Sequence, residues 1–279
     1  MLYVCGTPIG NLGDVTPRLL EALRGADLIA AEDTRHTRKL LSHFDIHRPL
    51  TSLFAHNEAH KTEEVMRLLR EGGDVALVSD AGMPGVSDPG MRLVAAALAE
   101  DIPVTVLPGP SAVLTALVAA GYPSDRFCFV GFLPRQATEL RRELARWRSC
   151  GGLVVAFEAP TRLPRTLAAL ACLAPDLNAA VCRELTKLHE EVARGTLAEL
   201  GEHYAGDPES EPVRGEITLV IDVGEPAAEA EPRPAAEDAA RDLLSRGLSR
   251  RDAAAALHVC LGVPRREADE LVREIAAGG

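Results

Sequence analysis

Short apolar segments alternate with amphipathic segments along most of this chain. The apolar segments are four or five residues long and predict β-strands at Leu2–Cys5, Leu28–Ala31, Val75–Val78, Val104–Leu107, Phe127–Val130, Leu153–Phe157, Ala179–Cys182 and Ile217–Ile221. Apolar positions at helical spacing predict helices at Pro17–Arg24, Thr37–His43, Glu58–Arg70, Met91–Ala99, Ser111–Ala120, Thr138–Arg148 and Thr161–Cys172. The alternation predicts an α/β fold. Strands that are apolar throughout are typical of parallel sheets covered on both faces.

The same pattern divides the chain into segments. It restarts near residues 109–115, which predicts an N-terminal α/β domain over 1–112 and a second α/β domain over 113–224. Residues 225–236 are rich in Pro, Ala and Glu and predict a linker. The tail, 237–279, shows only helical patterns, at Glu237–Arg246, Ser249–Leu257 and Pro264–Ala276. Short helices joined by glycine turns fit a helix-turn-helix, and they fit a small packing or dimerising appendage equally well.

Charge and composition narrow the class of protein. A chain of 279 residues can form two domains, and its net charge of −11 argues against a nucleic-acid binder that works by charge alone. One basic segment, Arg135–Arg148, carries five Arg against two Glu. No apolar run is long enough to span a membrane and the first residues read as a strand, so we expect a cytoplasmic protein. The six cysteines include no CxxC pair, and we expect neither a disulfide framework nor a zinc site.

The loop after Val75–Val78 is the strongest sign of a ligand site. Its sequence, from Ser79 to Gly90, is SDAGMPGVSDPG. In open α/β sheets, ligands bind outside the carboxyl ends of the strands. Glycines let the main chain approach a ligand, prolines fix the loop shape, and Asp80 and Asp88 supply acceptors for hydroxyls or a cation. A second loop, LPGPSA, also follows a strand, and Ser111 is placed to cap the next helix.

Two other motifs suggest chemistry that the rest of the sequence does not support. Glu32–Asp33 ends the second strand, where a Rossmann fold places its ribose-binding acid, but the first loop, GTPIGNLGD, lacks GxGxxG spacing. His56 and His60 are four residues apart, but they do not form HExxH and no third ligand follows at a suitable spacing. We therefore expect neither a nicotinamide cofactor nor a bound metal.

Seven motifs, taken in order, resemble one known family. They are GTPIGNLGDVTPR, AEDTRHTRKLL, SDAGMPGVSDPG, LPGPSA, FEAPTR, RELTKLHEEVARGTL and GEITLVI. The family is that of the small-subunit (16S) ribosomal RNA cytidine 2′-O-ribose methyltransferases, a branch of the tetrapyrrole-methylase superfamily. The resemblance covers residues 2–223, and the helical tail is similar to the extension of that branch.

The resemblance implies two facing α/β domains of the class III methyltransferase type, with S-adenosylmethionine folded in the cleft between them. It also implies a homodimer and a decoding-centre cytidine of 16S rRNA as substrate. Carried over by position, the cofactor-binding residues are Pro8, Ser79, Asp80, Met83, Ser111, Ala112, Phe157 and Leu185. Apolar Met83, Phe157 and Leu185 suit a purine base, while Asp80 and the loop amides suit the polar ends.

For the chemistry we expect four charged residues to act at the ribose. Asp33 is the candidate acceptor of the ribose proton, and Arg35 the candidate group holding a phosphate or the reacting oxygen. Lys187 would supply a second positive charge, oriented by Glu184. The alternative is that these residues are structural ion pairs. No metal is required by this reaction.

Two rival functions stay open at this point. One is methylation of a corrin or porphyrin ring, although such enzymes generally carry a GxGPGD-like first loop where this chain has GTPIGN. The other is a non-catalytic RNA-binding factor in ribosome assembly. Because the protein is acidic, we expect its local arginine clusters to contact rRNA in an assembled small subunit rather than free RNA.

Overall fold

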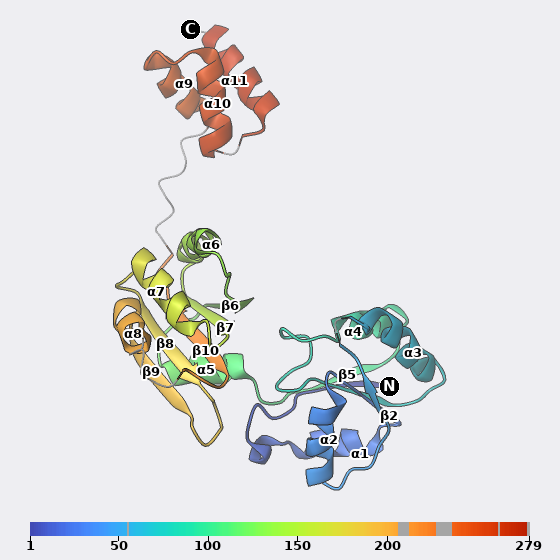
Figure 1. Ribbon diagram of the computed structural model, residues 1–279. Coiled ribbons are helices and arrows are strands. Elements are labelled where there is room, and N and C mark those ends of the chain that lie inside the picture. Colours follow the sequence, from blue (N-terminus) through green and yellow to red (C-terminus); the bar gives the residue numbers. More distant parts are fainter. Residues whose placement is uncertain (55, 206–211, 227–235, 262, 278–279) are drawn as a thin grey trace. The chain divides into compact units, whose positions relative to one another are not determined.

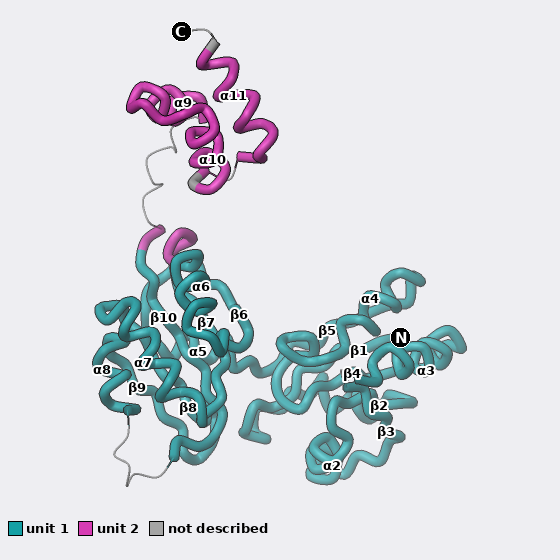
Figure 2. The backbone as a smooth tube through the Cα atoms, turned by 45° about the horizontal axis from the view of Figure 1, so that its top comes forward, with its two compact units in different colours: residues 1–147, 152–224 teal, residues 148–151, 225–279 magenta. Residues whose placement is uncertain are grey.

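The computed structural model describes residues 1–54, 56–205, 212–226, 236–261 and 263–277. They form two compact units, the first made of residues 1–147 and 152–224 and the second of 148–151 and 225–279 (Figure 2). The larger unit contains two five-stranded sheets, and the smaller one contains the helical tail. The predicted linker falls mostly on residues 227–235, which lie outside the described residues.

The first sheet is parallel throughout, as predicted. Its strands are β1 (Leu2–Cys5), β2 (Leu28–Ala31), β3 (Leu50–Ser52), β4 (Val75–Val78) and β5 (Val104–Leu107), in the order β3-β2-β4-β1-β5. Its helices are α1 (Pro17–Gly25), α2 (Thr34–His43), α3 (Glu58–Arg70) and α4 (Met91–Ala99), with a short 3-10 helix at Leu12–Asp14 (Figure 1). Side chains of α1 and α2 fill one apolar core and those of α3 and α4 another, so both faces are covered.

The second sheet corrects the prediction of parallel strands. It consists of β6 (Phe127–Phe132), β7 (Leu153–Glu158), β8 (Asn178–Arg183), β9 (Glu191–Thr196) and β10 (Ile217–Asp222), in the order β6-β7-β10-β8-β9. Only β6 and β7 are parallel. The connection from β8 to β9 is too short for the crossover that parallel neighbours need, so the chain turns back on itself. Burial on both faces accounts for the apolar strands without parallel pairing.

Helix α5 (Ala112–Ala120) joins the two sheets along the chain. It follows β5 of the first sheet, but Val113, Ala116 and Ala120 pack in a core with Val155 and Val220 of the second sheet. The other helices of this part are α6 (Ala137–Cys150), α7 (Leu163–Leu173) and α8 (Leu197–Tyr204). The predicted division between residues 112 and 113 therefore falls at the start of the helix that packs on the second sheet.

The tail forms three helices close to the predicted ranges. They are α9 (Ala236–Ser245), α10 (Arg250–Leu261) and α11 (Arg265–Ala277), packed around Ala240, Ala253, Leu257 and Val272. Within the described residues, no helix has the length and apolar character needed to cross a bilayer. The five cysteines whose side chains are described are free.

Candidate active site

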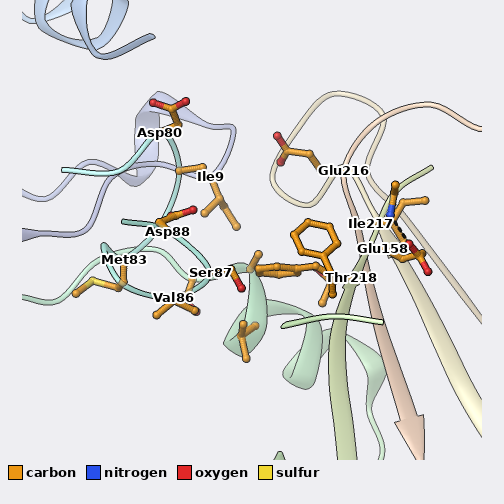
Figure 3. Close-up of a pocket in the computed structure, with 18 of the residues that line it drawn as sticks. Ile9, Asp80, Met83, Val86, Ser87, Asp88, Glu158, Glu216, Ile217 and Thr218 are labelled. Carbon is orange, nitrogen blue, oxygen red and sulfur yellow. Dashed lines mark hydrogen bonds between the residues drawn. The ribbon is translucent and has the colours of Figure 1, made fainter. Parts of the chain in front are cut away.

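Loops at the strand ends of both sheets line a cavity of about 480 Å³ (Figure 3). On the side of the first sheet its wall comes from the loops after β1, β2, β4 and β5; on the other side it comes from strands and loops of the second sheet. The lining residues discussed below are Ile9, Glu32, Asp80, Met83, Val86, Ser87, Asp88, Ser111, Ala112, Phe132, Phe157, Glu158, Glu216 and Thr218.

The loop after β4 is held in shape mainly by its own backbone. Thr7 and Gly82 exchange two backbone hydrogen bonds, of 2.9 and 3.1 Å, which join this loop to the one after β1. The hydroxyl of Ser79 donates to the carbonyl of Gly82 over 3.3 Å. Gly82 and Gly85 have φ angles of 76° and 83°, which are favourable only for glycine. Ser87 takes φ 67°, an uncommon conformation for a residue with a side chain.

Gly6 and Gly109 bring the first and third loops into backbone contact. A Cβ atom on Gly109 would lie 2.8 Å from the Cα of Gly6, and a Cβ on Gly6 would lie 2.7 Å from the sulfur of Met83. Side chains at these positions would push the loops apart. The two glycines therefore fix the spacing of the loops that carry Met83 and Ser111.

The wall from the second sheet is aromatic, with one buried acid. Phe157 makes edge-to-face contacts with Phe129 and Phe132, at centroid distances of 4.9 and 5.8 Å. The neighbouring carboxylate of Glu158 is fully buried and lies 3.2 Å from Nε of Arg162. It also accepts hydrogen bonds from the Ala159 amide and the Thr166 hydroxyl, both at 2.7 Å. Glu158 thus fixes the backbone of this wall.

The facing wall, on the first sheet, is acidic. Burial raises the pKa of the Glu32 carboxyl, and the nearby charges of Asp88, Asp80 and Asp33 raise it further, although a backbone hydrogen bond from Asp80 opposes them. The pKa of Asp88 is raised to about 6, mainly by burial and also by the charge of Asp80, while a hydrogen bond from Ser79 acts to lower it. This part of the cavity is suited to a positively charged ligand group.

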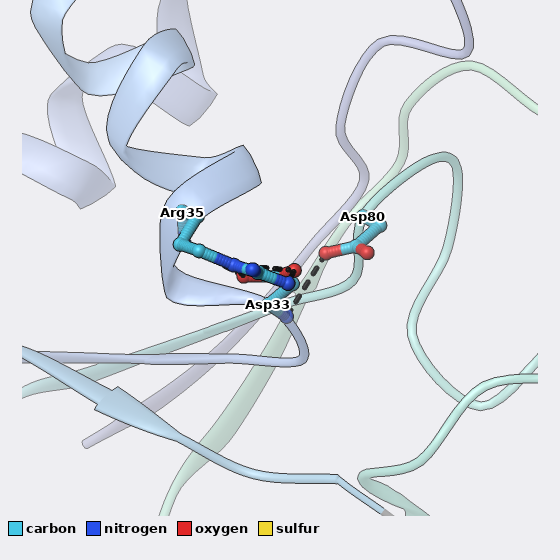
Figure 4. A network of polar contacts seen from close by, with 3 residues as sticks. All are labelled: Asp33, Arg35 and Asp80. Atoms are coloured by element: carbon cyan, nitrogen blue, oxygen red, sulfur yellow. Dashed lines mark hydrogen bonds and ion pairs between the residues drawn. The ribbon is translucent and has the colours of Figure 1, made fainter.

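Asp33 and Arg35 form an exposed ion pair next to the cavity (Figure 4). The guanidinium donates to both carboxylate oxygens, and its side chain is 84% exposed. The backbone N–H of Asp33 donates to Oδ1 of Asp80 over 3.0 Å, which ties this segment to the loop after β4. The hydrogen bonds from Arg35 lower the pKa of Asp33 to about 2. Neither side chain is part of the cavity lining described above.

Lys187 lies between two carboxylates. Its Nζ is 2.8 Å from Glu184 and 3.1 Å from Glu216. Burial alone would lower the pKa of Lys187, but the hydrogen bonds that it donates to both glutamates raise it, and the bond from Lys187 lowers the pKa of Glu184. The stem of Lys187 also packs on Gly10, where an added Cβ would lie 2.4 Å from its Cγ. The ion pairs hold Lys187 within the second-sheet part of the chain, and its stem contacts the first loop.

The predicted cofactor residues fall into three groups. Asp80, Met83, Ser111, Ala112 and Phe157 line the main cavity. Pro8 and Ser79 line, with Asp80, a separate smaller hollow of about 110 Å³. Leu185 is 6% exposed and packs in the apolar core shared with α5.

Sequence reasoning missed several lining residues on the second sheet. Phe132 and Thr218 lie on strands. Glu158 belongs to the FEAPTR motif, but nothing in the local sequence indicates that this glutamate lies at a cavity. Among the described residues there is no group of three His, Cys, Asp or Glu side chains placed to hold a metal ion.

The larger unit therefore combines a parallel sheet with a mixed sheet, and the loops at their strand ends line a cavity that suits a small ligand. The model for the tetrapyrrole (corrin/porphyrin) methylases matches residues 1–201. The chain belongs to this family and is an S-adenosylmethionine-dependent methyltransferase.

Individual relatives show how far the likeness extends. A relative from Micromonospora olivasterospora, named ribosomal RNA small subunit methyltransferase I, is 44% identical over 98% of this chain and 86% of its own. One of the same name from Synechocystis is 43% identical over 100% of this chain and 99% of its own. The structure of uroporphyrin-III C-methyltransferase from Thermus thermophilus, complexed with S-adenosyl homocysteine, shares the fold with a TM-score of 0.54 at 18% identity, covering 79% of this chain and 96% of that one.

Proposed function

We propose that this protein methylates the ribose 2′-hydroxyl of a decoding-centre cytidine in 16S rRNA, on the assembled small subunit. The observation that carries this proposal is the likeness to relatives named ribosomal RNA small subunit methyltransferase I, which extends over nearly the whole chain at 43 and 44% identity. An rRNA substrate would also place the enzyme in the cytoplasm.

The cavity suits S-adenosylmethionine, which supplies an electrophilic methyl group when bound. A purine base needs apolar and aromatic surface, which Met83 offers from the loop after β4 and Phe157 from β7 of the second sheet. A cationic group is favoured next to the carboxylates of Asp80 and Asp88. Ser111 caps helix α5 by accepting from the Leu114 amide, and it places the start of that helix at the cavity.

The remaining predicted cofactor residues support the wall around this ligand. Ala112 leaves room beside Ser111, and Ser79 holds the loop after β4 through Gly82. Pro8 belongs to the loop that Thr7 ties to Gly82. Leu185, being buried, supports the wall from the core rather than touching the adenine.

The charged residues outside the cavity are suited to holding RNA. The exposed guanidinium of Arg35 is available to a phosphate, and Asp33 orients it. With a pKa of about 2, Asp33 is a weak base, so its role in this proposal is orientation rather than proton transfer. Lys187, held by Glu184 and Glu216, fixes the second-sheet loop against the first loop.

We propose that the enzyme acts as a homodimer. Three elements that follow one another in the sequence expose large apolar side chains. Val106 on β5 is 55% exposed, Val118 on α5 is 81% exposed, and Phe127 on β6 is 47% exposed. A dimer interface over these elements would bury the three side chains together and remove their apolar surface from water. Light scattering on the Val118→Asp variant tests this, and an unchanged oligomeric mass would exclude Val118 from the interface.

Methyl transfer from labelled S-adenosylmethionine to undermodified small subunits tests the function directly. We expect one alkali-resistant ribose linkage, at a cytidine in the decoding region, and less transfer to deproteinised 16S rRNA. Transfer only to a tetrapyrrole ring would support the rival function within the same family. Absence of transfer to either substrate, with cofactor bound, would refute the proposal.

A further inference from the structure

Glu32 and Asp33 are consecutive residues at the end of β2, but their side chains serve different places. Asp33 is the N-cap residue of α2, and its carboxylate accepts from the Arg35 amide over 2.8 Å. Glu32 instead lines the main cavity. Asp33 has an extended backbone, with φ −112° and ψ 109°, and Glu32 lies in the bend between β2 and this cap. Only the first of the two acids faces the space where a ligand would react.

We propose that Glu32 is the catalytic residue that accepts the proton of the hydroxyl being methylated. The inference rests on the proposed function, since it needs a hydroxyl substrate and a bound methyl donor. The methyl carbon forms a bond to the hydroxyl oxygen while its bond to the sulfonium sulfur breaks. The electron pair of that bond stays on sulfur, and the hydroxyl proton passes to the carboxylate of Glu32.

Three other acids of the cavity hold structural contacts, and Glu32 itself accepts a backbone hydrogen bond from Asp80. Glu158 has Arg162, the Thr166 hydroxyl and a backbone amide on its two oxygens. Glu216 pairs with Lys187. Asp80 accepts the backbone N–H of Asp33. Each of these carboxylates therefore holds part of the wall, and a proton on any of them would weaken that contact.

Position separates Glu32 from the remaining acid, Asp88. Asp88 follows Val86 and Ser87 on the loop that forms the floor beside Met83 (Figure 3), where the donor is proposed to bind. Glu32 is one residue from the Asp33–Arg35 pair, the exposed cation proposed to hold an RNA phosphate. Because Arg35 and Glu32 belong to the same segment after β2, a ribose held through its phosphate by Arg35 would lie near Glu32.

The electrostatic surroundings favour proton acceptance by Glu32. Burial and the charges of Asp88, Asp80 and Asp33 raise its pKa, and Glu158 and Glu216 add acidic groups from across the cavity. Arg35 is the cation on the adjoining segment, and its hydrogen bonds go to Asp33. A general base works best when its pKa approaches the operating pH, so Glu32 is better suited than Asp33.

The test compares Glu32→Gln with Asp33→Asn in single-turnover methylation of undermodified small subunits. We expect Glu32→Gln to lose about 100-fold or more in the rate constant, as for removal of a positioned base. Its affinity for S-adenosylmethionine, measured by calorimetry, should change less than about threefold, which also shows that the variant folds. Glu32→Asp should recover part of the rate. Asp33→Asn should raise KM for subunits more than it lowers the rate constant.

The pH profile separates catalysis from a merely structural role. The wild-type rate should fall as pH drops through the pKa of Glu32, and Glu32→Gln should lose that dependence. A Glu32→Gln rate within threefold of wild type, or an unchanged pH profile, would overturn the inference. If Asp88→Asn, and not Glu32→Gln, lost the rate and the pH dependence, that result would overturn the inference as well. If wild-type protein methylates no subunit, the proposed function fails instead, so the two failures are distinguishable.

Discussion

Replacing Arg162 by alanine should destabilise the second sheet strongly, because it leaves a buried charge without its partner. The side chain of Glu158 is completely buried, and that of Arg162 is 25% exposed. Breaking a buried ion pair by removing one partner costs about 3–5 kcal/mol of unfolding free energy. Two hydrogen bonds to Glu158 remain after the change, from Ala159 and Thr166, so we expect about 3 kcal/mol, at the low end of that range.

The change also removes a link between the start of α7 and the segment that follows β6. Nη2 of Arg162 donates to the carbonyl of Leu133 over 2.7 Å, just after β6. Trp147 is the only tryptophan of the chain and lies buried in the same core as Leu163. Urea unfolding followed by its fluorescence therefore reports on this part of the molecule. A loss of about 3 kcal/mol should lower the melting temperature by roughly 10 °C.

Two comparisons make this result interpretable. Arg165→Ala removes an exposed arginine from the same helix and should change the unfolding free energy by less than about 0.5 kcal/mol. In the background of Glu158→Gln, which removes the buried charge, Arg162→Ala should cost clearly less than it does alone. If Arg162→Ala unfolds at the same urea concentration as Arg165→Ala, the buried pair does not stabilise the sheet and the reasoning is refuted.

Three further predictions concern the first-sheet side of the cavity. Gly109→Ala places a methyl group 2.8 Å from the Cα of Gly6, and we expect a loss of about 1–3 kcal/mol in calorimetric stability with weaker S-adenosylmethionine binding. Glu58→Ala removes the carboxylate that accepts from the Gly90 amide over 2.9 Å at the start of α4, and titration calorimetry should show weaker binding of the cofactor by the adjoining loop. The pKa of Asp88 is raised to about 6 in the folded state, so folding favours the protonated carboxyl. The stability that the protonated carboxyl contributes is lost as pH rises from about 4 to 6. Asp88→Asn cannot ionise, so it should melt at a higher temperature than wild type at pH 7 and at the same temperature at pH 4.

Matched variants guard each of these predictions. Gly25→Ala meets no atom within 4 Å at a helix end and should leave stability and binding nearly unchanged. Glu63→Ala, on the same helix as Glu58, removes an exposed partner of Arg70 and should not affect binding. Equal cofactor affinities for Glu58→Ala and Glu63→Ala would contradict the proposed link to the loop. The assignment of a raised pKa to Asp88 would be contradicted if the melting temperatures of Asp88→Asn and wild type differed by the same amount at pH 4 and at pH 7.

Local pattern was sufficient to predict most of the fold. Leu2–Cys5 and Val75–Val78 were predicted to the residue, because short apolar runs bounded by polar loops have few other interpretations. β3 was missed because it has three residues, and β9 because its sequence, EVARGT, is half-exposed and polar. Strand direction in the second sheet depends on connections rather than on composition, so apolar runs could not reveal it.

The candidate site shows a different limit. The glycine-rich loops after β4 and β5, which the sequence predicted as a ligand site, line the cavity, and their strand-end position could be inferred from local pattern. Side-chain direction at the end of β2 could not be inferred without knowing that Asp33 caps a helix. The burial of Leu185 and the pairing of Lys187 with two acids depend on contacts between residues far apart in sequence. Such contacts leave no local signal.

The position of β1 in its sheet has a consequence for synthesis of the chain. β1 is made first but lies between β4 and β5, with Leu2 paired to both Val75 and Val104. Its two edges are therefore completed at different times, the second only when β5 has been translated. Until then an apolar strand keeps an open edge, which is a hazard for misassociation on the ribosome. A chain that stops before Val104 should for this reason require chaperones or aggregate, even though four of the five strands of the first sheet are present.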